Sequence, residues 1–375
     1  MTTSAFDGSA LQLPPGTVPL AWVVRSGLIE SVHQGHLLAT GTDGSDVLAL
    51  GAPEAEIYAR SSLKPLQAVA MLRTGVDLTE EQIAVACASH NGQEQHRAVV
   101  RGILSGAGLT EAALANTPAL PLDPHAAQSW REAGNDAARI TQNCSGKHAA
   151  MLATCVHSGW PTGSYLQADH PLQEHILAVL AELTGRRARH VAVDGCGAPQ
   201  PSTTVRGLAQ AFAHLATAAP GTAEHRVAEA MRAHPFLVAG TGRDATEAMQ
   251  TVAGLIAKDG AEGVYAAALP DGRAVALKVA DGASRPRPVL LAGALRALGV
   301  EGEWDWERVP VLGHGEPVGA VQPAFDPVAG GAARAGAANA PGNDADSGDV
   351  TDSGDAGDSD DSGDSGDDGD RGAGA

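Results

Sequence analysis

The sequence predicts a protein of the α/β (α+β) class, because strand patterns stand at both ends of a series of helical patterns. Apolar runs flank the turn dipeptide Ser26-Gly27, which is typical of a β-hairpin, and another strand is expected at residues 46–50. A second hairpin pattern has its turn at Pro270-Asp271-Gly272. The segments between these hairpins carry helix-capping residues and amphipathic spacing.

The helices are recognised by the residues at their ends. Pro65 is tolerated only in a first turn, so a helix should start at or just before Ser61 and end near Gly75. Thr79 and Gln82 form a capping-box pattern. Asp169 is the expected cap of a helix that ends at Gly185. Further helices are expected at 94–107, 203–218, 222–233 and 286–298 and after Asn143 or Ser145, whereas residues 83–88 fit a strand or a buried helix.

Composition divides the 375 residues into three parts. Hydrophobic residues make up 43% of the chain and aromatic residues 3%, so small aliphatic side chains must fill the core. The formal charge is −19, and twelve aspartates between Asp344 and Asp370 leave about −7 for the rest. We expect a flexible lead at 1–18, one catalytic domain at 19–328 and a disordered tail rich in Gly, Asp and Ser at 329–375.

Several classes of protein are disfavoured by what the sequence lacks. No basic patch indicates nucleic-acid binding, and no apolar run approaches the ~20 residues that cross a bilayer. The first residues have neither the basic start nor the apolar stretch of a signal peptide, so a cytoplasmic location is expected. The four cysteines are then expected to be free thiols or ligands.

The strongest motif is Ser61-x-x-Lys64, within ARSSLKPLQAVA. Residues three apart on a helix share a face, and a neutral lysine can take the proton of a serine hydroxyl to make it a nucleophile. The start of a helix also favours an alkoxide. The same residues could be an exposed capping serine and a solvated lysine, so the motif by itself does not establish catalysis.

Other polar residues cluster at predicted loops and strand ends. Ser89-His90-Asn91-Gly92 follows the undecided segment, and Arg243 lies in a compact loop where it could hold a carboxylate. Lys278 lies in an apolar strand, either as an edge residue or as a cation aimed into a cleft. Cys144 and Lys147 stand three apart near a helix start, and Asp194 and Cys196 share a strand face. Two thiolates suit Zn²⁺.

Nine stretches in the same order resemble one family, the L-asparaginases of the serine–lysine class, also called rhizobial-type or Asparaginase_II. They cover roughly residues 20–322 and comprise GLIESVHQGH, ARSSLKPLQA, CASHNGQEQHR, NCSGKHAAML, DHPLQEHI, DGCGAP, HPFLVAGTGRDATEAM, GAEGVYAAALPDGRAVALKVADGASRP and GEPVGAV. The resemblance implies a fold similar to serine β-lactamases and serine-dependent glutaminases, with helices beside an antiparallel sheet. It also implies a homodimer that hydrolyses L-asparagine to L-aspartate and ammonia.

The resemblance also implies roles for particular residues. The catalytic residues of the family fall on Ser61, Lys64, Ser89 and Lys278. Its metal site falls on Cys144, Lys147 and Cys196, where zinc supports substrate binding more than chemistry. The candidates for holding the charged α-groups of the substrate are Arg60, His90, Asp194 and Arg243. Because a lysine base must be neutral to work, an alkaline optimum is expected.

Two other functions remain open from the sequence. The first is a glutaminase or another amidohydrolase on the same scaffold. A β-lactam hydrolase is weakened by the lack of Lys-Thr-Gly, although Ser-x-x-Lys and Ser89-x-Asn91 are present. The second is a catalytically silent zinc-binding or regulatory protein, in which the acidic tail recruits partners.

Overall fold

The central sheet is built from strands near both ends of the described chain. The computed structural model describes residues 16–327, so the predicted tail at 329–375 and most of the predicted lead at 1–18 lie outside the described residues. The sheet has eight strands in the order β10-β11-β1-β2-β9-β8-β7, with β3 paired to β2, and every pair is antiparallel. Its strands are β1 (Val18–Arg25), β2 (Leu28–Thr40), β3 (Asp46–Leu50), β7 (Ile256–Gly260), β8 (Val264–Ala268), β9 (Ala274–Val279), β10 (Pro310–Gly313) and β11 (Glu316–Pro323).

The first hairpin forms as its turn residues predict. Ser26 and Gly27 both have positive φ, +47° and +85°, and Arg25 pairs directly with Leu28 across them. Two central residues with positive φ give a turn whose twist matches that of the flanking strands. The second predicted hairpin is also confirmed, as β8 and β9.

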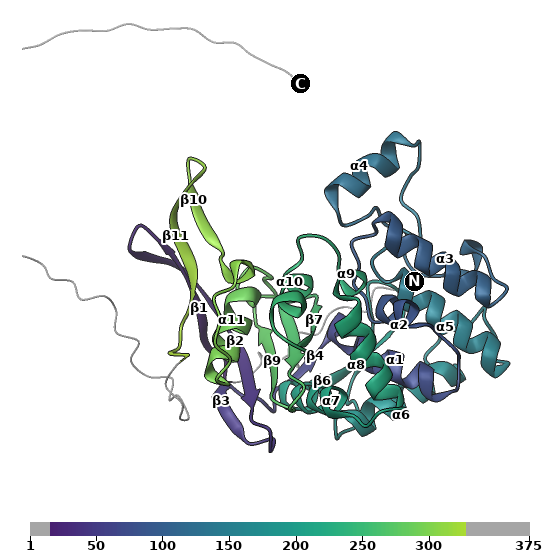
Figure 1. Ribbon diagram of the computed structural model, residues 1–375, viewed down its shortest axis with the longest axis horizontal. Helices are drawn as coiled ribbons and strands as arrows, with labels where there is room; N and C mark the ends of the chain where they lie inside the picture. The colour runs from purple at the N-terminus through teal and green to yellow at the C-terminus, as the bar shows by residue number, and fades with distance from the viewer. Residues whose placement is uncertain (1–15, 328–375) are drawn as a thin grey trace, which may run out of the picture. The chain divides into compact units, whose positions relative to one another are not determined.

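Helices fill the chain between these strands, as Figure 1 shows. They are η2 (Arg60–Leu63), α1 (Lys64–Arg73), α2 (Glu80–Ala86), α3 (Glu94–Gly106), η3 (Glu111–Ala113), α4 (Pro124–Glu132), α5 (Ser145–Ser158), α6 (Pro171–Leu183), α7 (Val205–Thr217), α8 (Ala223–Ala233), α9 (Pro235–Val238), α10 (Asp244–Thr251), α11 (Arg287–Ala297) and η4 (Asp305–Glu307). Together with the antiparallel sheet, they confirm the predicted α/β (α+β) class.

Most predicted helix ends are confirmed, and two differ. The capping box of α2 is present, with Thr79 and Gln82 bonded reciprocally. The cap of α6 is His170 rather than Asp169, because the His170 ring accepts the Leu172 N–H at 3.1 Å. The helix expected from residue 203 begins later, because the Thr204 side chain caps α7 by accepting the Gly207 N–H.

Five strands were not predicted from the sequence: β10, β11 and three short or interrupted strands. The small sheet β4-β6-β5 consists of β4 (Glu56–Tyr58), β5 (Val191–Val193) and β6 (Pro199–Thr204), of which only the region of β5 was expected. In β7, Lys258 and Asp259 interrupt the apolar run, although both residues are buried. This interrupted strand carries much of the candidate site.

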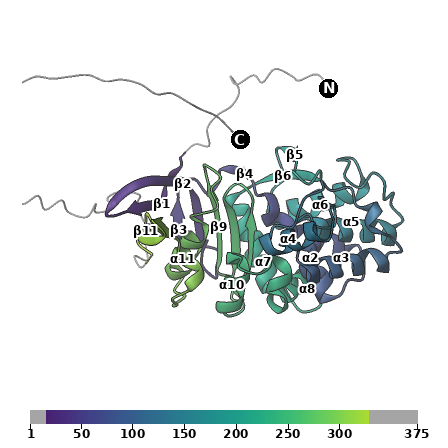
Figure 2. The same cartoon turned by 90° about the horizontal axis from the view of Figure 1, so that it is seen from above.

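The site lies where the sheet meets the helices. Helices α7 and α11 pack against β2, β8 and β9, and η2 packs against β7 and β8. Figure 2 shows the strands β1, β2 and β9 apart from the group formed by α2, α3 and α5. The core is mostly small aliphatic residues, as the composition predicts. Within residues 16–327, no helix has the length and apolar character that a bilayer span requires.

Candidate functional site

The short helix η2 presents Ser61 beside a strained backbone position. Arg60, the first residue of η2, has a φ of +50°, a left-handed conformation that is uncommon for a residue with a side chain. The α-helix has Pro65 in its first turn, as predicted, but it starts at Lys64 rather than at Ser61, which lies in the preceding 3-10 helix. Ser61 is half-buried and Lys64 is 2% exposed. Such strain is held in place by surrounding structure and is concentrated at functional sites.

Lys64 contacts the second predicted serine. Its Nζ donates to Ser89 Oγ at 3.1 Å and to the Ala88 carbonyl at 2.6 Å. Within residues 16–327, no hydrogen bond joins the Lys64 amine to the Ser61 hydroxyl, and this hydroxyl has no hydrogen-bond partner. The backbone N–H of Lys64 does donate to the Ser61 carbonyl. The lysine is therefore enclosed, as a base must be, and the half-buried Ser61 hydroxyl is free to meet a ligand.

A second buried lysine, Lys258, stands next to this pair. It is fully buried on β7, and its Nζ donates to Asp259 Oδ1 at 2.6 Å. Burial lowers the pKa of Lys258 to about 8, with Asp259 opposing the shift and the nearby charge of Lys64 adding to it. The Ser62 hydroxyl donates to the Lys258 carbonyl at 3.1 Å, which ties β7 to η2.

Arg243 connects Asp259, the partner of Lys258, to the loop that carries Ser89. Its Nη2 donates to Asp259 Oδ2 at 2.6 Å, and its Nη1 donates to Asn91 Oδ1 at 3.1 Å and to the Ser89 carbonyl at 3.3 Å. Burial alone would raise the pKa of Asp259, but Lys258 and Arg243 outweigh it and hold the pKa well below its usual value. Asp259 is therefore a carboxylate at neutral pH.

Next to Ser61, Arg60 and Asp194 form an ion pair. Arg60 Nε donates to Asp194 Oδ1 at 2.7 Å, and the two side chains are 26% and 10% exposed. Burial opposes the ionisation of Asp194, but Lys147 and Arg60 together hold its pKa below the usual value. The pair offers one cation and one anion that solvent reaches in part.

A thiol cluster adjoins the same ion pair. Cys144 and Cys196 pack together with Ala198, and Lys147 Nζ donates to Cys196 Sγ at 3.3 Å. The interaction between the two neighbouring thiols lowers the pKa of Cys144 and raises that of Cys196. The nearby charges of Lys64 and Lys147 also act to lower the pKa of Cys144.

A family model described as L-asparaginase II matches residues 21–323. The chain belongs to the L-asparaginase II family. Membership indicates an amidohydrolase that acts on a small molecule. A comparison with curated proteins found no match.

Solved structures resemble this asparaginase-family chain only distantly. Mglu in its glutamate form has 15% identity and a TM-score of 0.41, covering 72% of this chain and 62% of its own. A β-lactamase from Mycobacterium bovis, Mb2281c, has 16% identity and a TM-score of 0.40, covering 71% and 95%. EstCE1, a hydrolase with promiscuous acyltransferase activity, has 12% identity and the same TM-score, covering 70% and 93%. The chain spans about two thirds of the Mglu chains.

The structure places the predicted Lys278 and a second lysine, Lys258, differently with respect to Lys64. Lys278 is not brought to the Lys64–Ser89 pair: its Nζ donates to the carbonyls of Glu262 and Val279 at 2.7 and 2.5 Å. The lysine beside Lys64 is Lys258. A Lys-x-Gly pattern would have found it, because Lys258-Asp259-Gly260 differs from the Lys-Thr-Gly of β-lactam hydrolases only in its middle residue.

All four predicted substrate-binding residues have partners within the protein. His90 is fully buried, with its Nε2 at 2.9 Å from Ser145 Oγ and its Nδ1 accepting the Gly92 N–H. Arg243 makes the internal bonds described above. Arg60 and Asp194 pair with each other beside Ser61; the exposed fractions of the side chains are 26% for Arg60, 10% for Asp194 and 21% for Arg243.

The thiol cluster of this asparaginase-family chain does not fit zinc as it is arranged. Within residues 16–327, no group of three or more His, Cys, Asp or Glu side chains is placed to hold a metal ion. Lys147 would complete the donor set only as a neutral amine, but the thiols and Asp194 raise its pKa against the effect of burial. Zinc at Cys144, Lys147 and Cys196 therefore stays a prediction.

Proposed function

We propose that the chain hydrolyses the side-chain amide of L-asparagine to L-aspartate and ammonia, with Ser61 as the nucleophile. The observation that carries the proposal is the enclosed Lys64, one turn from Ser61 and hydrogen bonded to Ser89 Oγ at 3.1 Å. Family membership supports the reaction class.

Accessibility favours Ser61 over Ser89 as the nucleophile. Ser61 is half-buried at the start of a helix, whereas Ser89 is 4% exposed and already contacts Lys64. An attacking oxygen must reach a substrate carbon, and the Ser61 hydroxyl has both access and no hydrogen bond to break within the described residues. Ser89 is then suited to pass protons to and from Lys64.

The reaction proceeds in two stages. Neutral Lys64 takes the Ser61 proton, Ser61 Oγ bonds to the amide carbon, and the carbon–nitrogen bond breaks as the nitrogen receives a proton and leaves as ammonia. Water then attacks the ester and restores Ser61, releasing aspartate. Ser89 and Lys258 relay the protons, and backbone N–H groups at the start of η2 and α1 stabilise the oxyanion.

The Arg60–Asp194 pair is suited to the charged end of the amino acid. Arg60 would bind the α-carboxylate and Asp194 the α-ammonium, because each offers the opposite charge next to Ser61. A substrate that engages both would exchange one ion pair for two. This arrangement fixes the amino-acid end and leaves the length of the side chain to select asparagine or glutamine.

Two alternatives are separated by the same assay. Equal release of ammonia from asparagine and glutamine would indicate a general amidohydrolase. No release from either, with stoichiometric zinc after dialysis, would indicate a silent zinc-binding protein. The predicted homodimer is to be tested by sedimentation.

The deciding experiment compares Ser61→Ala with Ser129→Ala. Ser129 is an exposed serine on α4, far from the machinery in sequence and without a role in it. We expect Ser61→Ala to release no ammonia from asparagine above background while keeping the circular dichroism spectrum of the parent, and Ser129→Ala to keep full activity. Parent-like activity in Ser61→Ala would remove Ser61 as the nucleophile.

A further inference from the structure

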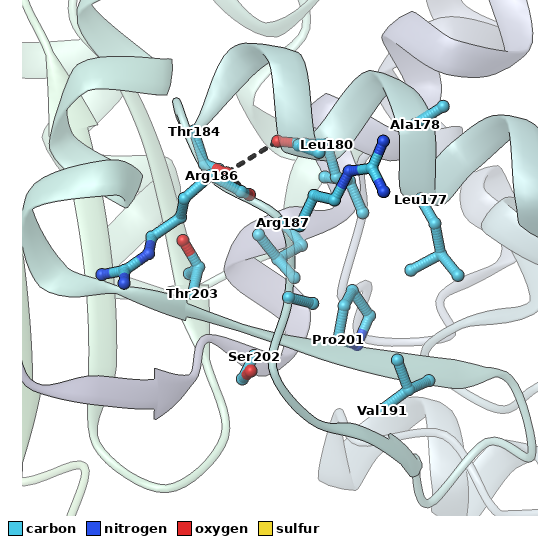
Figure 3. Close-up of a pocket in the computed structure, with 13 residues that line it drawn as sticks. Leu177, Ala178, Leu180, Thr184, Arg186, Arg187, Val191, Pro201, Ser202 and Thr203 are labelled. Carbon is cyan, nitrogen blue, oxygen red and sulfur yellow. Dashed lines mark hydrogen bonds between the residues drawn. The ribbon is translucent and has the colours of Figure 1, made fainter.

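A cavity of about 300 Å³ lies behind η2, outside the candidate active site. Figure 3 shows it between the end of α6, the segment that follows it, and the strands β5 and β6. None of Ser61, Lys64, Ser89 or Lys258 lines it. Its volume is at the lower end of the range for small-molecule sites.

The wall of this α6–β6 cavity is mainly apolar. Leu63, Leu177, Leu180, Val191 and Pro201 contribute to it. Val191 is 47% exposed, so an apolar side chain is left at the rim. Apolar walls that remain accessible to water gain free energy when an apolar ligand covers them.

The polar side chains of the wall are almost all committed to other partners. Ser202 Oγ donates to Glu56 and Thr184 Oγ1 donates to the Leu180 carbonyl at 2.7 Å. The Thr203 hydroxyl has no partner, but it is enclosed. Hydroxyl groups are therefore not what would recognise a ligand here.

One positively charged side chain of the cavity wall is available to bind a ligand. Within the described residues, no ion pair or hydrogen bond of the Arg187 side chain is formed, whereas Arg186 faces Glu54 at 3.9 Å. In Figure 3, Arg187 extends along α6 toward Ala178 and Leu177, and Arg186 extends the opposite way. A planar guanidinium at the edge of an apolar cavity suits a carboxylate.

We propose that the α6–β6 cavity binds a small amphipathic monocarboxylate, with its carboxylate on Arg187 and its apolar body against Leu177, Leu180 and Pro201. A single free cation matches a single negative charge, and the apolar wall favours an organic acid over inorganic phosphate. Leu63, which lies between Ser61 and Lys64 in the sequence, forms part of the same wall. The proposal concerns binding and does not rest on the proposed function.

The test is calorimetric titration of the full chain with 4-phenylbutyrate, its neutral amide and inorganic phosphate. We expect one site for the carboxylate, at least tenfold weaker binding of the amide, and no heat with phosphate. Equal binding of acid and amide, binding of phosphate, or no binding of the acid would each overturn the proposal.

Variants then test whether the carboxylate binds in the α6–β6 cavity. Arg187→Gln should weaken binding of the acid at least tenfold, and Arg189→Gln is the matched control, because Arg189 belongs to the same segment but does not line the cavity. Ala178→Trp should abolish binding by filling the cavity. Parent-like affinity in Arg187→Gln or Ala178→Trp, with circular dichroism unchanged, would contradict this location. A dimer that dissociates in Ala178→Trp would show that a second copy covers this wall instead.

Discussion

Arg243 and Asp259 form a buried ion pair in which Nη2 lies 2.6 Å from Oδ2. The other oxygen of Asp259 accepts from Lys258, and the other nitrogen of Arg243 donates to the Ser89 loop. One carboxylate thus connects a strand lysine to the loop that carries Ser89. This connection fixes the distance between groups that lie about 170 residues apart in the sequence, as Ser89 and Lys258 do.

We predict that Arg243→Gln destabilises the protein and lowers ammonia release. Breaking a buried ion pair costs about 3–5 kcal/mol, and we expect about 3 kcal/mol because the Arg243 side chain is 21% exposed. Urea denaturation measures the free energy of unfolding. Arg101→Gln is the control, because Arg101 pairs with Glu111 on the surface and its loss should cost at most about 1 kcal/mol. Equal costs in the two variants would contradict the role given to Arg243.

The two candidate lysines give a second prediction. Lys258→Met should reduce kcat for asparagine by at least a hundredfold, because general acid–base groups contribute about 10²–10⁴-fold. Lys278→Met should stay within about threefold of the parent, because Lys278 contacts only nearby backbone carbonyls and no residue of the site. The measurement is steady-state ammonia release. A large loss in Lys278→Met with parent-like activity in Lys258→Met would restore the assignment made from sequence.

Stability should rise with pH between about 8 and 9 because of Lys258. Its pKa is about 8 in the folded protein and near 10.5 when unfolded, so in this window the unfolded chain binds more protons than the folded one. The free energy of unfolding should then increase by up to about 1.4 kcal/mol per pH unit. Cys87 and Cys155 have the opposite effect above pH 9. Burial raises their pKa values to about 12 and 11, so the folded protein keeps thiol protons that the unfolded chain loses, and the free energy of unfolding falls as pH rises.

Denaturation at pH 7.5, 8.0, 8.5 and 9.0 checks this slope, with Lys258→Met as the comparison. The variant has no lysine to titrate, so its slope should be smaller than that of the parent over the same window. Parallel curves would show that Lys258 does not change protonation on unfolding there. Ammonia release by the parent should also increase through about pH 8 as Lys258 becomes neutral.

Short sequence motifs predicted much of the fold, but they failed where charged residues are buried within a strand and break its apolar pattern. The Ser26-Gly27 turn and the Thr79–Gln82 box are complete within a few residues, so each was read correctly. Strand β7 was missed because Lys258 and Asp259 break its apolar run. Two such charges are buried only because they pair with each other and with Arg243, and that partner is far away in the sequence.

The sequence also predicted only part of the candidate site. Ser61 and Lys64, which share one short motif, lie in the consecutive segments η2 and α1, but the Lys64 amine bonds to Ser89 and Ala88 rather than to the Ser61 hydroxyl. Residues chosen for their chemical type alone, such as His90, turned out to be enclosed and already bonded. Whether a polar side chain faces a ligand or its own protein depends on tertiary contacts, which spacing does not contain.

The cap of α2 supports Ser89 from a distance, and its loss should affect stability more than activity. Thr79→Ala removes the hydroxyl that accepts the Gln82 N–H and should lower the free energy of unfolding by about 1 kcal/mol. Thr110→Ala is the control, because Thr110 precedes η3 without a side-chain cap bond and its replacement should cost close to nothing. Thermal denaturation of both variants measures the difference. A cost for Thr110→Ala as large as that for Thr79→Ala would show that the cap contributes little.

Gly240 holds the loop that positions Asn91, and replacing it should disturb the site directly. Its φ is +123°, and an added Cβ would lie 2.6 Å from the Asn91 side chain, which accepts from Arg243. We expect Gly240→Ala to displace Asn91, to destabilise the protein and to lower kcat. Gly242→Ala is the matched control: its φ of +66° carries a backbone cost of about 1–2 kcal/mol, but its Cβ would meet no atom within 4 Å. Ammonia release should therefore fall in Gly240→Ala and stay near the parent value in Gly242→Ala. An equal effect in both variants would mean that backbone strain, and not the contact with Asn91, governs this loop.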